Sequence, residues 1–296
     1  MPVVVRVPAK VNLHLGVGPL RPDGFHELVT VFHAVDLVDS VTASPAPRLS
    51  LSVHGEADGV PTDSANLAWR AAILLAEHAS VEPSVRLEIT KAIPVAGGMA
   101  GGSADAAAAL VACAELWGVP RSVLPGLAAR LGSDVAFPLL GGTALGTGRG
   151  EVLTPAEAPG SLHWVFALAA HGMSTAEAYR ELDRQRAAGS APPPALDAAP
   201  MLDALRSGDP RRVAAALSND LQPAALALAP ALRRTLDAGR DLGALAGIVS
   251  GSGPTCAFLC PDADAARRLA PALAAEGGCR TTRAACGPAP GATVVP

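Results

Sequence analysis

The sequence predicts an α+β protein with two domains that meet near residue 160. Its length of 296 residues suits about two domains and a substantial core. The first half alternates strand-like and helix-like stretches, and the second half is mostly helical around a few strand-like segments. We therefore expect an N-terminal domain at residues 1–160 and a C-terminal domain at residues 161–296.

The first half begins with a short β-branched strand at Val3–Val7. A turn signal at Arg21–Gly24 precedes a second strand at Leu28–Val35. The further elements expected in this half are a half-buried strand at Leu49–Val53, a helix that Ser64 or Asn66 caps and that reaches His78, an alternating strand at Val85–Ile89, and helices at Ser103–Trp117 and Pro120–Leu131. Beyond Asp134, glycine-rich, strand-like segments continue to about Leu153.

The second half opens with a buried strand at Leu162–Ala169. Ser174 and Glu177 have the spacing of a capping box, which predicts a helix start. The proline-rich segment Gly189–Pro200 predicts a flexible connector. The remaining expected elements are helices at Met201–Ser207, Arg211–Leu217, Ala224–Gly239 and Asp262–Glu276, a strand-like segment at Ile248–Leu259 with a Gly-Ser-Gly turn, and a frayed tail after Gly287.

Composition and charge exclude several classes of protein. Half of the residues are apolar but only 3% are aromatic, so the core must come largely from Ala, Val and Leu. The apolar runs are far shorter than the roughly 20 residues of a bilayer span, and no secretory signal is visible, so we expect a cytoplasmic protein. A net charge of −4 gives no electrostatic footprint for nucleic acid. Five irregularly spaced cysteines support neither a zinc site nor a disulfide framework.

The strongest functional pattern is the glycine-rich loop Pro94–Asp105, which holds Gly97, Gly98, Gly101 and Gly102. Glycine lets the backbone come close to a ligand, and the helix N-terminus behind the loop offers amide donors and a positive dipole end. Together they suit a triphosphate. The pattern is neither a P-loop, because no lysine follows, nor a dinucleotide fingerprint. The alternative is a plain flexible turn, which so many glycines before an alanine-rich helix disfavour.

Three titratable residues could carry chemistry. Lys10 is one of only two lysines and lies among apolar residues, where a lysine stays charged only beside an anion; an isolated lysine is otherwise usually a surface residue. Asp134 precedes an apolar segment and could be a cap or turn residue. His26 lies in a turn-rich segment, where a surface or structural role is common. The local sequence leaves both interpretations open for each residue.

Taken together, these segments resemble the GHMP small-molecule kinases, the superfamily that contains galactokinase, homoserine kinase and mevalonate kinase. The glycine loop is similar to the second motif of that superfamily, and Val249–Thr255 is similar to the third. Pro8–Leu15 and Arg21–Leu28 are similar to the opening of those members that act on cytidine diphosphate methylerythritol. The same members are matched, in order, by Gly132–Val135, Gly148–Glu151 and Asn219–Leu221.

The resemblance implies a two-domain GHMP kinase fold. The N-terminal domain would resemble domain 2 of ribosomal protein S5, with a left-handed βαβ unit, the C-terminal domain would be an α/β plait, and the active site would lie between them. The implied reaction is the ATP-dependent phosphorylation of the 2-hydroxyl of cytidine diphosphate methylerythritol, in non-mevalonate isoprenoid biosynthesis, with ATP and Mg²⁺ as cofactors. We expect this small molecule as the partner, neither nucleic acid nor a membrane, and either a monomer or a homodimer.

The resemblance also assigns roles to single residues. Asp134 matches the catalytic base that takes the hydroxyl proton, and Lys10 matches the lysine that keeps it ionised and stabilises the attacking oxygen. The residues that match the ATP-binding loop are Pro94, Val95, Ala96, Gly97, Gly98, Met99, Ala100, Gly101, Gly102, Ser103 and Ala104. Ser103 would also be the candidate contact for the metal ion. Ala100 and Ala104 depart from the glycine and second serine that many members carry.

Four residues match the substrate pocket. Asn12 and His26 would line it, and His26 would read the edge of the cytosine. Phe25 would stack on the base, with Tyr179 as the opposing ring; such contacts are worth roughly 1–3 kcal/mol. Two alternatives remain. The first is another GHMP kinase that acts on homoserine or mevalonate, which would not need a base-binding segment at Asp23–His26. The second is an ATP-binding sensor, which would need neither Lys10 nor Asp134.

Overall fold

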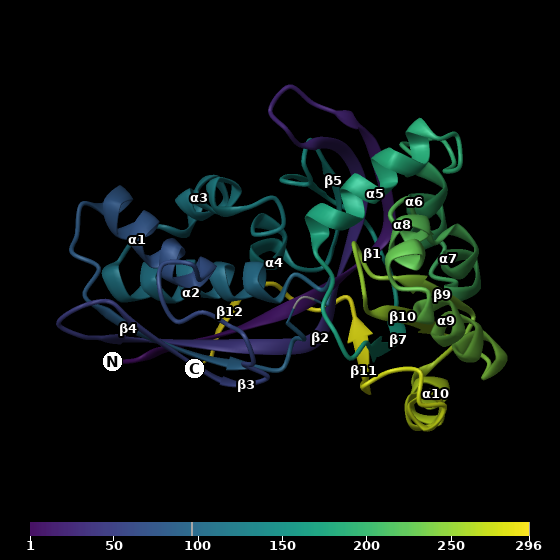
Figure 1. The fold of residues 1–296 in the computed structure, drawn as a ribbon. Helices are drawn as coiled ribbons and strands as arrows, with labels where there is room; N and C mark the ends of the chain where they lie inside the picture. Colours follow the sequence, from purple (N-terminus) through teal and green to yellow (C-terminus); the bar gives the residue numbers. More distant parts are fainter. Residues whose placement is uncertain (96, 296) are drawn as a thin grey trace.

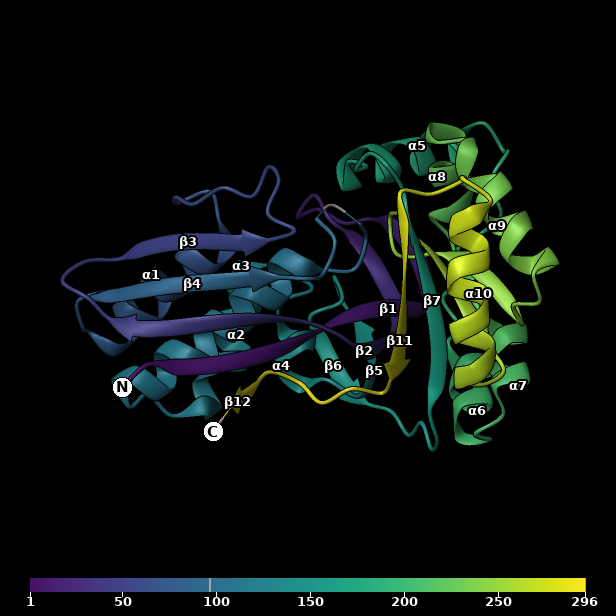
Figure 2. The ribbon, with the colours of Figure 1, turned by 90° about the horizontal axis from the view of Figure 1, so that it is seen from below.

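A mixed β-sheet built mainly by the first half of the chain forms one part of the molecule (Figure 1). The structure is a computed structural model that describes residues 1–95 and 97–295. Two long antiparallel strands, β1 (Val3–Leu20) and β2 (His26–Pro45), run from this part toward the other (Figure 2). The shorter strands of the sheet are β3 (Ser50–Gly55), β4 (Val85–Lys91), β5 (Thr143–Thr147), β6 (Val152–Pro155), β8 (Ser218–Asn219) and β12 (Thr293–Val295).

The strand β1 is much longer than the predicted Val3–Val7. The sequence pattern marked only this β-branched run before Pro8, and proline lacks the amide that a ladder needs. Instead, the pairing of β1 with β2 shifts its register between Pro8 and Ala9, and proline is tolerated at such an irregularity. The strand continues to Leu20 and therefore carries Lys10 within the sheet.

Helices cover one face of this first sheet (Figures 1 and 2). They are α1 (Leu67–Ala79), α2 (Gly101–Trp117), the short 3₁₀ helix η1 (Arg121–Val123), α3 (Leu124–Leu131) and α4 (Ala136–Leu140). Asn66, not Ser64, caps α1, because its side chain accepts a hydrogen bond of 2.8 Å from the amide of Ala68. The alanine-rich helix α2 is buried along most of its length, as a helix without a polar face must be.

A four-stranded antiparallel sheet forms the second part of the molecule. Its strands, in the spatial order β11–β7–β10–β9, are β11 (Thr281–Gly287), β7 (Leu162–Leu168), β10 (Cys256–Cys260) and β9 (Ala246–Val249). The helices of this part are α5 (Thr175–Ala187), α6 (Ala199–Arg206), α7 (Pro210–Ala216), α8 (Gln222–Leu228), α9 (Ala231–Asp241) and α10 (Ala263–Ala275). One hydrophobic core cluster includes Val5 and Leu13 of the first sheet together with Trp164 and Phe166 of the second, so the two parts share a core.

Several predicted elements differ from the structure. The single helix expected at Ala224–Gly239 is two helices, α8 and α9, which Ala229 and Pro230 separate. The helix α4 lies in a region that we expected to be strand-like, and β11 was not predicted at all. The tail after Gly287 does not fray: β12 pairs with the first residues of β1, with Val295 opposite Val4.

The connector Gly189–Pro200 is attached to the fold rather than free. The carboxylate of Asp220 accepts hydrogen bonds from the amides of Ala195 (3.1 Å) and Val17 (2.8 Å). His14 reaches the carbonyl of Ala195 at 2.8 Å. These contacts fasten the connector along β1. The division of the chain at residues 160 and 161 falls between β6 and β7 and remains a proposal. None of the helices in the described parts of the chain is long and apolar enough to cross a membrane.

Candidate active site

A cavity of about 810 Å³ lies where the two parts of the molecule meet. Its walls come from β1 and β2, the glycine loop, the start of α2, the turns before α4 and between β5 and β6, α5, and the Gly-Ser-Gly turn. Most of the predicted site residues line this cavity: Lys10, Asn12, Phe25, His26, Pro94, Gly97, Gly98, Ala100, Gly101, Gly102, Ser103, Asp134 and Tyr179. The fold thus brings together residues that are far apart in the sequence.

Lys10 and Asp134 form an ion pair inside this cavity. The Nζ atom of Lys10 lies 3.5 Å from Oδ2 of Asp134, and the two side chains are 6% and 35% exposed. The ring of Phe32 lies with its centroid 5.7 Å from the same Nζ and adds a cation–π contact. A carboxylate that is open to the cavity beside a buried cation can accept a proton from a bound alcohol.

Asn12 fixes the position of this lysine through a chain of buried hydrogen bonds. Lys10 Nζ donates to Oδ1 of Asn12 at 2.6 Å, and Nδ2 of Asn12 donates to the hydroxyl of Thr30 at 2.8 Å. The Thr30 hydroxyl in turn donates to the carbonyl of His14 at 2.7 Å. Lys10 and Asn12 lie two residues apart on β1 and therefore share a face of the sheet. A buried polar chain with partners at each step holds one geometry.

The glycine loop is attached to its neighbours through its backbone. Gly98 has a φ of +75°, and a Cβ at this position would lie 2.1 Å from the carbonyl oxygen of Ser250, so only glycine fits. The Ser250 hydroxyl donates to the Gly98 carbonyl at 3.1 Å. The amide of Lys10 donates to the carbonyl of Met99 at 3.3 Å. The loop is therefore held between β1 and the Gly-Ser-Gly turn.

The start of α2 borders the cavity directly after the loop. Gly101, Gly102 and Ser103 line it, so the unpaired amides of the first helical turn are available to an anionic ligand. The helix begins two residues earlier than the predicted Ser103. Ala100 precedes it in the left-handed conformation, with a φ of +58°.

Some of the predicted ATP-binding residues do not line this cavity. The side chains of Met99 and Ala104 are fully buried in the core, so any contact with a nucleotide would come from their backbones. Val95 lines a second, smaller cavity instead. Ala96 lies outside the described residues.

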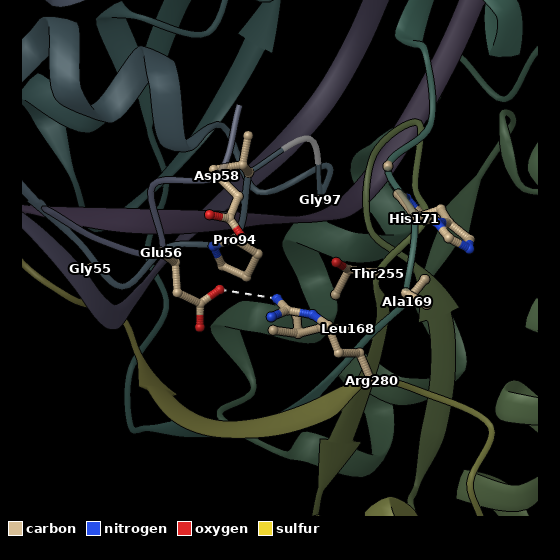
Figure 3. A pocket seen from close by; sticks show the side chains of 14 residues that line it. Gly55, Glu56, Asp58, Pro94, Gly97, Leu168, Ala169, His171, Thr255 and Arg280 are labelled. Carbon is tan, nitrogen blue, oxygen red and sulfur yellow. Dashed lines mark hydrogen bonds and ion pairs between the residues drawn. The ribbon is translucent and has the colours of Figure 1, made fainter. Parts of the chain in front are cut away.

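The second cavity, of about 380 Å³, adjoins the same loop, and Pro94 and Gly97 line both cavities. Figure 3 shows Glu56, which follows β3, opposite Arg280, which precedes β11. The Glu56 carboxylate accepts from Arg280 at 3.0 Å and from Arg283 at 2.8 Å. One carboxylate therefore links the first sheet to the second beside the glycine loop.

Three of the predicted substrate-binding side chains are aromatic and lie along the main cavity. Phe25 is 48% exposed, and the guanidinium of Arg149 lies 4.8 Å from its ring centroid. The rings of His26 and Tyr179 lie 5.1 Å apart and are tilted by 32°. An exposed ring beside a pair of packed rings offers the surfaces on which a planar base can stack.

Two charged residues influence this aromatic group. Nε2 of His26 lies 2.9 Å from Oδ1 of Asp183, which fixes the orientation of the imidazole. Burial, and then the negative charge of Asp134, raise the pKa of Tyr179. The Tyr179 side chain is therefore a neutral phenol at neutral pH, close enough to Asp134 to be affected by its charge.

The Gly-Ser-Gly turn lies against the ion pair. Gly251 has a φ of +55°, and a Cβ there would lie 3.3 Å from Nζ of Lys10. The side-chain amide of Asn219 donates to the carbonyls of Val249 (2.8 Å) and Gly251 (2.7 Å) and so fixes the turn. The turn therefore belongs to the site rather than being a tight turn elsewhere on the surface.

The donor set of the cavity suits a metal ion that arrives with a nucleotide. Mg²⁺ is usually held by one or two protein groups together with substrate phosphates and water. The carboxylate of Asp134 and the hydroxyl of Ser103 both line the cavity and fit that pattern. Within residues 1–95 and 97–295, no group of three or more His, Cys, Asp and Glu side chains is placed to hold an ion.

The sequence did not single out several residues that the fold brings to the site. Thr30 and Phe32 reach it through the register of β1 with β2, and Asp183 reaches it through the docking of α5. Arg149 lies in the matched segment Gly148–Glu151, which was the available signal. The others carry no local signal, because their partners lie far away in the sequence.

Known proteins resemble this chain in sequence along its full length. The family description "GHMP kinases N terminal domain" matches residues 66–142, and "GHMP kinases C terminal" matches residues 201–279. A 4-diphosphocytidyl-2-C-methyl-D-erythritol kinase from Mycolicibacterium gilvum (strain PYR-GCK) is 61% identical and covers 99% of this chain and 93% of its own. A protein of the same name from Thermobifida fusca (strain YX) is 60% identical, with coverages of 99% and 98%.

Solved structures resemble it in fold. A crystal structure of 4-(cytidine 5'-diphospho)-2C-methyl-D-erythritol kinase has a TM-score of 0.78 and 35% identity, and covers 95% of this chain and 98% of its own. Homoserine kinase from Cytophaga hutchinsonii has a TM-score of 0.76 at 18% identity, with coverages of 99% and 97%, and shows the likeness of fold alone. The predicted GHMP kinase fold is therefore confirmed. The chain belongs to the GHMP kinases and, within them, to the family of 4-diphosphocytidyl-2-C-methyl-D-erythritol kinases.

Proposed function

We propose that this protein transfers the γ-phosphoryl group of ATP to the 2-hydroxyl of 4-diphosphocytidyl-2-C-methyl-D-erythritol and releases ADP and the 2-phosphate. The observation that carries the proposal is the pair Lys10–Asp134, 3.5 Å apart in the cavity that the glycine loop borders. The names of the relatives support the choice of substrate. The reaction would be a step of non-mevalonate isoprenoid biosynthesis. It would take both ATP and the cytidine-bearing substrate from the cytoplasm.

Asp134 would act as the general base. The acceptor is a tertiary alcohol, which is a weak nucleophile until its proton is removed. The carboxylate takes that proton as the oxygen attacks the γ-phosphorus. Lys10, held by Asn12 at 2.6 Å, would stabilise the negative charge that develops on the attacking oxygen.

The glycine loop and the start of α2 would hold the phosphates of ATP. Phosphoryl transfer depends mainly on positioning and on the stabilisation of charge, and the first amides of α2 supply both. Ser103 would contact a Mg²⁺ ion that the phosphates also hold. When bound, Mg²⁺ neutralises charge on the transferred group.

The aromatic group would bind the cytosine. Phe25 and Tyr179 would stack on the base. Nε2 of His26 lies against Asp183, so Nδ1 is the ring nitrogen that would accept a hydrogen bond from the exocyclic amine of cytosine. This group favours a cytidine-bearing acceptor over homoserine or mevalonate, which have no ring to stack.

A coupled ADP-release assay tests the reaction and its base together. The wild-type protein should release ADP with 4-diphosphocytidyl-2-C-methyl-D-erythritol, and not with galactose, homoserine or mevalonate. Asp134→Asn should lower kcat by about 10²–10⁴-fold, since that is the usual contribution of a general base, while ATP still binds. Asp237→Asn, on the exposed surface of α9, is the matched control. Turnover with homoserine alone would refute the substrate, and near-normal kcat in Asp134→Asn would refute the base.

A further inference from the structure

Three charged side chains form a buried network beside the glycine loop. Nζ of Lys91, at the end of β4, lies 2.5 Å from Oδ2 of Asp39 on β2 and 2.6 Å from Oδ2 of Asp105 on α2. The three residues are 0% (Asp39), 4% (Lys91) and 2% (Asp105) exposed. None of them lines the active-site cavity.

This network fastens the loop at both ends. At its beginning, Oδ1 of Asp39 accepts hydrogen bonds from the amides of Ala92 (2.6 Å) and Ile93 (2.8 Å), which lead into the loop. At its end, Asp105 belongs to α2, the helix that begins as the loop stops. Lys91 joins the two carboxylates and so connects the entry of the loop to its exit.

The network also contacts the start of α2 directly. A Cβ on Gly101 would lie 3.3 Å from Nζ of Lys91 and 3.1 Å from Cγ2 of Ile93. The first turn of α2 therefore rests on Lys91. A shift of this lysine would move the amides that face the cavity.

Stability alone is a poor explanation for this arrangement. Well-packed apolar residues can often replace a buried ion pair without loss of stability, because desolvation offsets the Coulomb attraction. Here two carboxylates share one ammonium, and Oδ1 of Asp105 is buried without a hydrogen-bond partner among residues 1–95 and 97–295. A buried oxygen without a partner is expected where a network maintains a particular geometry rather than adding stability.

We propose that Asp39, Lys91 and Asp105 are positioning residues that hold the glycine loop and the start of α2 in the shape that binds the phosphates of ATP. The inference rests on the proposed function in one respect, namely that the ligand of the loop is ATP. The network touches no substrate and acts through the backbone of the loop.

The charge of the network fits this role. Burial raises the pKa of the Asp105 carboxyl to about 7; Asp39 acts in the same direction and Lys91 opposes it. Lys91 from β4 and Asp39 from β2 are the charged groups that act on Asp105. Lys91 therefore offsets the repulsion between two buried carboxylates and keeps Asp105 in place beside Asp39.

Asp105→Ala tests the proposal, because it releases the far end of the loop and leaves the Asp39–Lys91 pair intact. Titration calorimetry with MgATP, on the full chain and without acceptor, should show affinity weakened by about tenfold or more, since small misplacements of binding groups have large effects. In the kinase assay the KM for ATP should rise and the KM for the acceptor should not. Asp105→Asn, which can still accept from Lys91, should restore ATP affinity to within about threefold of wild type.

Cys113→Ala, at an equally buried position on the same helix, should bind ATP like the wild type. Melting curves identify any variant that does not fold. If Asp105→Ala does not fold, the same titration compares Asp105→Asn with Lys91→Met. Wild-type ATP affinity in folded Asp105→Ala, or equal losses in the Ala and Asn variants, would overturn the proposal. Calorimetry needs no acceptor, so a wild type that binds ATP without turnover would refute the substrate assignment and leave this inference standing.

Discussion

At the scale of single residues, side chain and backbone conformation disagree at Ala100, among the described residues of the glycine loop. Ala100 precedes α2 with a φ of +58° and a ψ of 33°. The left-handed conformation costs a non-glycine residue roughly 1–2 kcal/mol. Ser80 has the same conformation, with a φ of 54°, at the end of α1. Ala100 adjoins the start of α2, to which we assign the binding of ATP phosphates, whereas Ser80 caps α1.

Replacement of Ala100 by glycine should therefore relieve strain. The gain is partly offset by the greater freedom of glycine in the unfolded chain, about 0.4–1 kcal/mol, so the free energy of unfolding should rise by up to about 1 kcal/mol. Urea denaturation measures it, and Ser80→Gly is the matched control. ATP affinity should change only in Ala100→Gly. A loss of stability in both variants would contradict the assigned strain.

At the residue scale, motifs in the sequence marked positions that the fold brings together. Lys10, Asn12 and Asp134 lie in matched segments, and the structure places all three on one cavity. Lys91 was not predicted as a functional residue, because nothing near it in the sequence shows that Asp39 and Asp105 surround it. A buried ion network is a property of the folded chain, and its members come from β2, β4 and α2.

At the scale of elements, the predicted starts of helices were accurate where a capping side chain marks them. Asn66, Ser174 and Asp262 each accept a backbone hydrogen bond at the start of a predicted helix. The strands β11 and β12 were missed because each is defined by its partner: β11 by β7, and β12 by β1. The sequence of β11 is rich in Thr and Ala, and β12 has only three residues, so neither shows the period-two pattern that indicates a strand.

His33 joins three of these strands. It lies fully buried on β2, and its Nδ1 is 2.8 Å from the hydroxyl of Thr143 on β5. Gly287, the last residue of β11, packs so closely that a Cβ there would lie 2.3 Å from Nε2. Burial lowers the pKa of His33 from 6.5 to about 4, against the opposing hydrogen bond to the backbone of Gly287.

The stability of the protein should therefore fall in mild acid. Below pH 6.5 the unfolded chain binds a proton at this histidine, while the folded chain does not until about pH 4, so the stabilisation is complete above pH 6.5 and is lost as the pH falls. Between pH 7 and 5 the loss from this group is about 2 kcal/mol. Urea denaturation at both pH values should show a smaller loss for His33→Gln than for wild type. Equal losses would mean that His33 does not titrate in this way.

At the scale of the whole molecule, the α+β character followed from the pattern of the chain. The sequence could not show that the sheets share one core, or that the C-terminal end returns to the first sheet. Both are long-range contacts. Glu56 is a further example, since it meets Arg280 (Figure 3) and Arg283 from the other end of the chain.

The Glu56 ion pairs should make a small, salt-dependent contribution to the joining of the two sheets. Glu56→Gln should lower the free energy of unfolding by less than about 1 kcal/mol, because partly exposed pairs are weak. The difference should vanish near 1 M salt, where the screening length is about 3 Å. Glu177→Gln, in an exposed pair within α5, is the control. A loss that persists in high salt would show that Glu56 acts by packing or hydrogen bonding instead.

The pairing of β12 with β1 also bears on how the chain is made. A ribosome releases β1 first and β12 last, yet they lie side by side at one edge of the first sheet. During synthesis, the amides and carbonyls along that edge of β1 have no β12 partner until almost the whole remaining chain has been made. Exposed strand edges recruit other chains, and contacts between distant segments form slowly. The nascent protein therefore exposes this edge of β1 to other chains until β12 emerges.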